Sequence, residues 1–401
     1  MRQLRRDFPT LDVEEPPVYL DNACVTLRPR TVIDAIRRYY DEHPSCGGRS
    51  LHRYGTKVSM GVARTRHSMA RYLGASSDEE VIFTKNATHS INQVAIGLPL
   101  ERGSVILVSD REHNSNLVPW RMKADREGLD LRVVPSQPDN TFDMETFETM
   151  ADQAGDRLGL VAMSQVGNLD GVEVPIQDVA RIAHDFGALV AVDGAQSVPH
   201  QPIDVQHLGI DFLSFSIHKM LGPSGMGCLW GRKDLLDGMT PLMAGGSTVS
   251  NASHEDMAWL PPPARFEGGL GHYAGILGTE AALEYLHRMD LEAIHEHEIR
   301  LNRIMSEAII HRSDAEVIGP EAAERRGSIC SITTDKVEVQ DLAIMLDEGM
   351  GIMVRAGRHC VHDWFNRRGV DGSLRASAYM YNTVEEAKLF RDSIDELLEA
   401  F

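Results

Sequence analysis

Short apolar runs alternate with amphipathic segments between residues 81 and 216, and this alternation constrains the fold more than any other feature. The runs are nearly all apolar and rich in β-branched residues, which is typical of strands buried on both faces. They occupy 81–84, 104–109, 131–134, 158–164, 188–193 and 212–216. Amphipathic segments at 87–98, 115–127, 143–155 and 175–186 predict helices between them. The pattern therefore predicts βαβ units that form a mostly parallel sheet covered on both faces.

The pattern changes near residue 270. Two long helices are predicted over 272–289 and 291–312, the first as a spine between domains. Strands at 327–334, 351–357 and 373–381 and helices at 338–349 and 383–399 then predict an α+β domain. We expect an N-terminal segment (1–30) that packs on the small domain, a large α/β domain (31–285) and a small C-terminal domain (286–401).

Composition excludes several classes of protein. With 401 residues, 42% of them hydrophobic, the chain can bury a large core. A net charge of −19 argues against a nucleic-acid partner, which needs clustered lysine and arginine. We expect no membrane span and no export signal, because no apolar run approaches eighteen residues and the basic start lacks an apolar segment.

Five cysteines stand far apart, with no C-x-x-C pair. Their odd number and spacing argue against a disulfide framework and a zinc finger, so we expect no metal site and a cytoplasmic location. At least one thiol could be chemically active. Four are expected to be silent: Cys24, Cys46, Cys228 and Cys330.

Polar residues follow four of the predicted strands, at the edge where open α/β sheets bind ligands. A turn with small residues opens a helix at Ala87 and Thr88, which suits a phosphate although an ordinary helix cap is the commoner explanation of such a turn. His113 follows the strand at 104–109, and Asp193 and Gln196 follow the strand at 188–193. The strand ends predict an anion cradle, an imidazole and a carboxylate at one edge.

Lys219 completes this set directly after the strand at 212–216. Only seven of the 40 lysine and arginine residues are lysines, and this one follows an apolar run and precedes the glycine-rich "GPSGMG". An amine that forms an imine, a carboxylate for a pyridinium nitrogen, a phosphate site and a ring to stack match pyridoxal phosphate. A nicotinamide cofactor is disfavoured because no G-x-G-x-x-G turn follows the first strand.

The segment "VDGAQSVPHQPIDVQHLGIDFLSFSIHKMLGPSGMGCLWG" closely resembles the class V aminotransferase family of fold type I pyridoxal phosphate enzymes. Within it, the chain is similar to the Suf-type (group II) cysteine desulfurases and selenocysteine lyases. Further likeness lies in "YLDNA", "EHNSNLVPW", "RFEGG", "RAGRHC" and "LRASAYMYNT". The resemblance implies a seven-stranded, mostly parallel sheet domain with a smaller α+β domain.

The resemblance also implies residue roles. Lys219 would hold the cofactor covalently and move protons, Asp193 would pair with the ring nitrogen, and Gln196 would reach the ring hydroxyl. His113 would stack on the ring and assist proton transfer. Four residues would surround the phosphate: Ala87 through its backbone, Thr88, Ser216 and His218.

On the substrate side, the resemblance implies that Arg375 clamps the carboxylate, with Asn168, Arg355 and His52 nearby. Cys360 would attack the sulfur of L-cysteine, leaving alanine and an enzyme persulfide for a protein acceptor. The motif "RAGRHC" supplies Arg355, Arg358 and His359, positive surroundings that favour a reactive thiolate. A homodimer is implied as well.

The chain departs from the family pattern at several positions. Thr56 stands where relatives carry a second histidine, and His89 replaces an acid in the phosphate turn. Leu270 replaces a threonine that reaches the phosphate of the neighbouring subunit, with Ser247 or Thr248 as a possible substitute. The alternatives are a selenocysteine lyase or another lyase for β-substituted amino acids, a transaminase, and an inactive scaffold or sulfur-relay partner.

Overall fold

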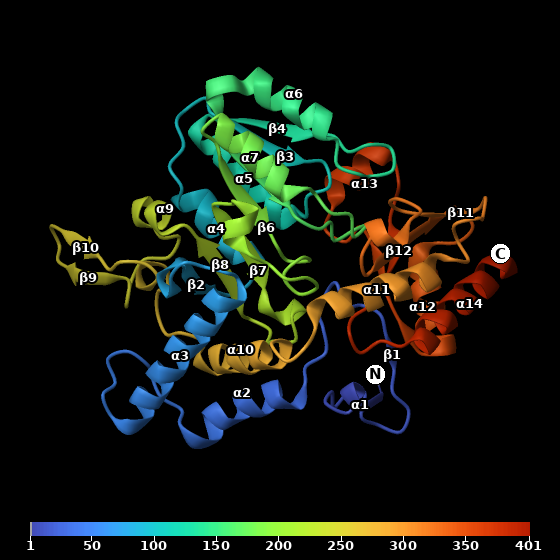
Figure 1. Ribbon diagram of the computed structural model, residues 1–401, viewed down its shortest axis with the longest axis horizontal. Helices are drawn as coiled ribbons and strands as arrows, with labels where there is room; N and C mark the ends of the chain where they lie inside the picture. The colour runs from blue at the N-terminus through green and yellow to red at the C-terminus, as the bar shows by residue number, and fades with distance from the viewer. Residues whose placement is uncertain (1) are drawn as a thin grey trace.

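The computed structural model describes residues 2–401 and contains a large, mostly parallel sheet (Figure 1). Its strand order is β2-β8-β7-β6-β5-β3-β4, in which the neighbours from β7 to β4 are parallel and β8 runs antiparallel to β2 and β7. The predicted α/β fold is confirmed. The strands are β2 Val81–Thr84, β3 Val105–Ser109, β4 Asp130–Val134, β5 Leu158–Ser164, β6 Leu189–Asp193, β7 Phe212–Ser216 and β8 Gly227–Gly231.

The inner strands of this sheet are buried on both faces, which explains why they are mostly apolar, whereas the edge strand β4 is half-buried and carries Asp130 and Arg132. Val105 and Leu107 of β3 belong to the core on one face, whereas Ile106 and Val108 belong to the core on the other. Successive side chains of a strand point to opposite faces, so a strand covered twice needs apolar residues at every position. Crossover helices follow the strands as predicted: α4 Ala87–Gly97, α5 Asn114–Glu127, α6 Met144–Ala154 and α7 Ile176–Asp185.

Three helices pack together beside the sheet: α2 (Arg30–Glu42), α3 (Arg53–Tyr72) and α10 (Tyr273–Leu286) (Figure 1). Two glycines allow this close approach. A Cβ on Gly61 would lie 2.4 Å from the Leu277 side chain, and one on Gly278 would lie 2.7 Å from Ile36. The sequence predicted α10 but neither of its partners.

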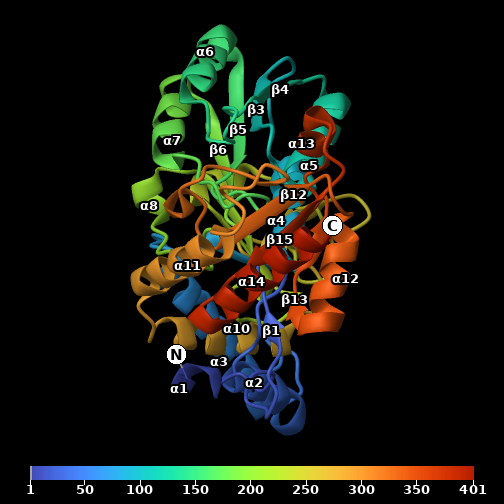
Figure 2. The ribbon, with the colours of Figure 1, turned by 90° about the vertical axis from the view of Figure 1, so that its right-hand side faces the viewer.

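The second sheet is antiparallel, in the order β11-β12-β15-β14, and α11, α12 and α14 lie against it (Figure 2). The predicted helix over 291–312 is too long, because α11 ends at Ser306, whose hydroxyl bonds back to the Asn302 carbonyl and accepts from buried Arg326. The elements are α11 Leu291–Ser306, β11 Ala315–Val317, β12 Ile329–Thr334, α12 Val339–Met350, β13 Ile352–Met353, β14 Arg355–Gly357, α13 His362–Arg368, β15 Ser373–Ser377 and α14 Val384–Ala400.

The N-terminal segment lies against this C-terminal region (Figure 2). After α1 (Arg2–Arg5), strand β1 (Val18–Tyr19) pairs in parallel with β13, and Asp21 bridges to Ser377. Phe8 is fully buried, with its ring centroid 4.7 Å from that of Tyr381. Of the predicted segment 1–30, Met1 lies outside the described residues, and the division into three domains stays a prediction.

A short hairpin formed by β9 (Val249–Ala252) and β10 (Met257–Trp259) projects from the body of the protein (Figure 1). Two short helices, α8 (Val205–Leu208) and α9 (Lys233–Gly238), complete the elements named here. Within residues 2–401 no helix is long and apolar enough to cross a membrane. The same described residues contain no group of three or more histidine, cysteine or acidic side chains placed to hold a metal.

Candidate active site

A cavity of about 440 Å³ opens at the carboxyl ends of the central strands, where sheets of this type bind ligands. It lies between those strand ends and the loop that follows β14. All of the predicted site residues line it except His52: Ala87, Thr88, His113, Asn168, Asp193, Gln196, Ser216, His218, Lys219, Arg355, Cys360 and Arg375.

Asp193 and Lys219 lie at the ends of two adjacent strands, and the charge of each affects the pKa of the other. Asp193 ends β6 and accepts a hydrogen bond from the Ala195 N–H (2.9 Å), whereas Lys219 closes a short turn after β7. Burial raises the pKa of Asp193 to about 6 and lowers the pKa of Lys219 to about 8, although each opposes the other's shift. The amine therefore loses its proton far more readily than a surface lysine.

The start of α4 and the end of β7 form one end of the cavity. The Ala87 N–H donates to the Ser216 hydroxyl (2.9 Å), and the Thr88 and Ser115 hydroxyls lie 2.7 Å apart. Burial, with help from Lys219 and Arg28, lowers the pKa of His218 to about 4. This end presents a helix N-terminus, hydroxyls and a neutral imidazole, which together suit a phosphate group.

His113 is held rigidly at the start of α5. Its Nδ1 accepts a hydrogen bond from the Ser115 N–H (3.0 Å), which places the ring proton on Nε2. Burial lowers the pKa of His113 to about 4, with Lys219 and Arg375 acting in the same direction. The ring is therefore neutral at physiological pH.

Glu112 fixes the strand end beneath His113, and sequence reasoning missed it. The carboxylate is buried and accepts hydrogen bonds from the Ser109 hydroxyl, the Ser164 N–H and hydroxyl, and Asn116. Burial raises the pKa of Glu112 despite these donors. An acid next to a predicted site histidine is the signal that could have identified it.

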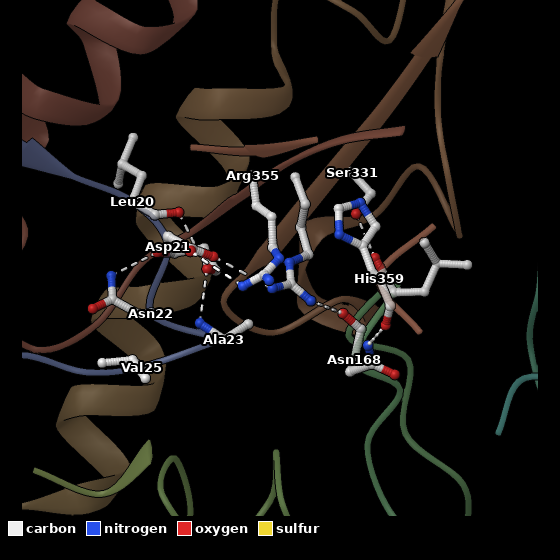
Figure 3. Close-up of polar contacts among 12 residues, drawn as sticks. Leu20, Asp21, Asn22, Ala23, Val25, Asn168, Ser331, Arg355 and His359 are labelled. Atoms are coloured by element: carbon white, nitrogen blue, oxygen red, sulfur yellow. Dashed lines mark hydrogen bonds and ion pairs between the residues drawn. The ribbon is translucent and has the colours of Figure 1, made fainter. Parts of the chain in front are cut away.

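Two arginines give the opposite end of the cavity its positive charge (Figure 3). Arg375 of β15 and Arg355 of β14 are register partners, and each lies 3.5 Å from a carboxylate oxygen of Asp21. Arg375 also donates to the Asn168 carbonyl (2.8 Å), yet its buried Nε has no partner. An unsatisfied, buried guanidinium that lines a cavity suits a ligand carboxylate.

The loop that carries Cys360 is held from both sides. The Cys360 carbonyl accepts from the Asn114 N–H (2.7 Å), and the Asn168 side chain donates to the His359 carbonyl (2.8 Å; Figure 3). His359 and Cys360 both have positive φ angles, 46° and 60°. The Cys360 side chain is exposed, so the loop presents a thiol at the mouth of the cavity.

The predicted origin of the positive charge around Cys360 needs correction. His359 is buried, its Nε2 faces the Ser373 carbonyl and hydroxyl (3.0 Å each), and burial, followed by the charge of Arg375, lowers its pKa to about 3. It is therefore neutral. Arg358 is engaged by Asn366 (2.9 Å) and by the backbone of Asp371 (3.1 Å). Arg355 and Arg358 remain the cations of the motif, and both line the cavity.

The family departures lie outside the cavity in this chain. His52 caps α3 by accepting from the Gly55 N–H, so its predicted substrate contact stays a prediction. Leu270 is 75% exposed in the loop before α10. Thr248 is buried and bonds to the Gly245 backbone, while His89 accepts from the Lys85 N–H. None of these side chains lines the cavity.

Cys24, which we expect to be silent, also lines the cavity. Its signal in the sequence was position alone, because it follows "YLDNA" directly. Sequence spacing gave no indication that this segment reaches the arginines of the C-terminal sheet.

Comparison with known proteins places the chain in a family. Residues 18–390 match the model of the family described as Aminotransferase class-V. A probable cysteine desulfurase of Halobacterium salinarum is 36% identical over 405 residues, covering 99% of this chain and 96% of the relative. A cysteine desulfurase of Klebsiella pneumoniae is 38% identical over 393 residues, covering 96% and 95%.

Solved structures agree with these relatives. The apo cysteine desulfurase of Thermococcus onnurineus superposes with a TM-score of 0.94 at 31% identity, and the cysteine desulfurase CsdA of Escherichia coli with 0.90 at 31%. Each comparison covers 100% of this chain and 98% of the other. The chain belongs to the class V aminotransferase family, and the predicted resemblance is confirmed.

Proposed function

We propose that the protein is a pyridoxal phosphate-dependent cysteine desulfurase that carries sulfur on Cys360. The enzyme type predicted from the sequence is confirmed by relatives of 32–38% identity along nearly the whole chain that bear this name. The residue roles below are our proposals, and the cavity geometry supports them.

The residues of the cavity fit pyridoxal phosphate. When bound, this cofactor draws electrons from the α-carbon of an amino acid. Lys219 would hold it covalently and Asp193 would pair with the ring nitrogen. The buried Gln196 Oε1 has no partner and would meet the ring hydroxyl. Four groups would bind the phosphate: the Ala87 N–H, Thr88, Ser216 and His218.

The substrate would lie between the arginines and Cys360. Arg375 would bind the carboxylate of L-cysteine, which supplies the partner that its Nε lacks. The Cys360 thiolate would attack the substrate sulfur, so that an S–S bond forms as the C–S bond breaks. Lys219, whose lowered pKa lets it give and take a proton near neutral pH, would protonate the carbon that leaves as alanine.

The observation that carries the proposal is that Lys219, Arg375 and Cys360 line one cavity although they come from separate parts of the chain. The test is the production of alanine and sulfide from L-cysteine, with dithiothreitol, by the wild type and Cys360→Ala. We expect the activity of the variant to be about a hundredfold or more lower than that of the wild type, while the cofactor absorbance is retained. Full activity in the variant would contradict the persulfide step and favour a direct lyase.

We further propose a homodimer and a protein that accepts sulfur from Cys360. The exposed position of the Cys360 thiol supports delivery to a partner. Large apolar side chains are exposed at Leu51 (89%) and Leu270 (75%), which supports contact with a second copy. Sedimentation of the purified protein at several concentrations tests the dimer.

A further inference from the structure

The cavity contains two thiols, because Cys24 and Cys360 both line it. Cys24 is half-buried and lines the cavity, whereas Cys228 and Cys330 are buried in the protein interior. The proposed function uses Cys360 alone and leaves Cys24 without a role.

Asp21 ties the segment of Cys24 to the arginine end of the cavity. The Cys24 N–H donates to the Asp21 carbonyl (3.2 Å), and the Asp21 carboxylate lies 3.5 Å from both Arg355 and Arg375. Figure 3 shows Arg355 between Asp21 on one side and His359, the neighbour of Cys360, on the other. The N-terminal segment and the cysteine loop therefore meet across this arginine.

Arg355 lies within reach of both thiols. Burial would lower the pKa of Arg355, but Cys24 when ionised, the Asp21 carboxylate and, more weakly, an ionised Cys360 raise it. An ionised Cys24 would raise the pKa values of Lys219 and Arg375 as well. Reactive thiols occupy electropositive and partly exposed surroundings of this kind. The buried Arg375 Nε in the same cavity has no partner, which leaves a polar contact open to a bound ligand.

We propose that Cys24 is a second sulfur-accepting thiol, which takes the outer sulfur from the Cys360 persulfide within the cavity. This inference rests on the proposed function, which loads Cys360. The Cys24 thiolate attacks the outer sulfur, a new S–S bond forms to Cys24, and the bond to the Cys360 sulfur breaks. Cys360 leaves as a thiolate with the electron pair, so the transfer consumes no oxidant or reductant.

The consequence is that two turnovers in the absence of any acceptor leave one sulfur on each of the two cysteines. Cys360 is exposed and can present sulfur to a partner, whereas Cys24 is half-buried and would hold sulfur away from solvent. The freed Cys360 would then accept a second sulfur. We therefore expect more than one sulfane sulfur per chain when cysteine is in excess.

The experiment is peptide mass spectrometry of the cofactor-loaded protein after brief reaction with L-cysteine, with persulfides trapped by an alkylating reagent. In the wild type we expect persulfide on Cys360 first and on Cys24 later. Cys360→Ser should lower the persulfide on Cys24 about tenfold or more, since the sulfur arrives through Cys360. Cys24→Ala should carry persulfide on Cys360 and contain about half of the total sulfane sulfur.

Cys46 is the matched control, because it is an exposed thiol that does not line the cavity. Equal labelling of Cys46 and Cys24 would overturn the inference by showing unspecific spread of sulfur. Persulfide on Cys24 in Cys360→Ser at the wild-type level, a Cys24–Cys360 disulfide in place of a Cys24 persulfide, or an unlabelled Cys24 beside a loaded Cys360 would each overturn it. Absence of persulfide from Cys360 itself would instead reject the proposed function.

Discussion

At the scale of single residues, burial shifts the pKa values of Asp193 and Lys219 in opposite directions. Burial disfavours charge on both, which raises the pKa of the acid to about 6 and lowers that of the amine to about 8. The amine of an unfolded chain has a pKa near its ordinary value of about 10.5. Between pH values of about 8 and about 10.5, folded Lys219 has released its proton whereas the unfolded chain still binds it. The unfolded state then binds more protons, so stability rises with pH over this range.

Lys219→Met should therefore stabilise the cofactor-free protein at pH 7. Removal of a charge that is costly to bury is expected to gain about 2 kcal/mol, after allowance for partial exposure to the cavity. The gain should shrink as pH rises from about 8 toward 10.5, because the wild-type amine sheds its proton there. Urea unfolding at pH 7 and pH 9.5 measures it, with exposed Lys388→Met as the control that should change little.

A hydrogen bond from Asn168 restrains the loop that carries Cys360. The Asn168 amide is buried and donates to the His359 carbonyl (2.8 Å), so it restrains the residue next to the thiol. Asn168→Ala should leave that carbonyl without its donor, at a cost of about 1–3 kcal/mol to the local structure. In cofactor-free protein we expect Cys360 to react with iodoacetamide severalfold faster. An unchanged rate would show that the Asn114 contact alone holds the loop.

At the scale of elements, periodicity predicts the parts whose burial is uniform. The strands β2, β3, β5, β6 and β7 are covered on both faces, and their apolar runs reveal them with boundaries in error by a residue or so. Helices α2 and α3 were not predicted. Their contacts with α10 form at Gly278 of α10, which meets Ile36 of α2, and at Gly61 of α3, which meets Leu277, and a glycine adds no apolar residue to the pattern. Helix α13 escaped prediction because polar residues surround its two buried aromatic residues, Trp364 and Phe365.

The residues of the site also fall into those that the sequence predicts and those that it does not. Residues directly after strands, such as Asp193 and Lys219, are predictable because the carboxyl ends of parallel strands share an edge. Asp21 and Cys24 are not, because the parallel pairing of β1 with β13 brings together residues more than 300 positions apart. The sequence predicts that the N-terminal segment packs on the small domain, but it does not indicate which residues of the segment reach the cavity.

Helix α14 offers an element-scale prediction, because its first turn carries a full capping box. The Thr383 hydroxyl accepts from the Glu386 N–H (3.1 Å), and the Glu386 carboxylate accepts from the Thr383 N–H (2.9 Å). Thr383→Ala should lower the free energy of unfolding by about 1 kcal/mol, whereas Thr383→Ser should retain most of it. Urea titration monitored by circular dichroism compares the three proteins, and equal midpoints for Ala and wild type would contradict the cap.

At the scale of the whole molecule, the N-terminal segment connects regions that lie far apart in the sequence. Arg5 pairs with Glu386 (2.8 Å) and donates to the Tyr381 carbonyl (2.8 Å), while Asp7 accepts from the Tyr285 hydroxyl (2.8 Å). Phe8 is fully buried against the rings of Tyr381 and Tyr285. The same segment carries Asp21 and Cys24 to the arginines, so its docking affects both stability and the substrate end of the cavity.

Phe8→Ala should therefore destabilise the protein and weaken the site together. Loss of a fully buried aromatic side chain costs about 3–5 kcal/mol through lost burial and the cavity that remains. Because Asp21 would lose part of its support, we also expect a higher KM for L-cysteine, with a smaller change in kcat. Phe401→Ala is the control, since Phe401 is 57% exposed and its loss should change stability by no more than about 0.5 kcal/mol. A destabilised Phe8→Ala with an unchanged KM would show that the arginine end keeps its geometry without the N-terminal segment.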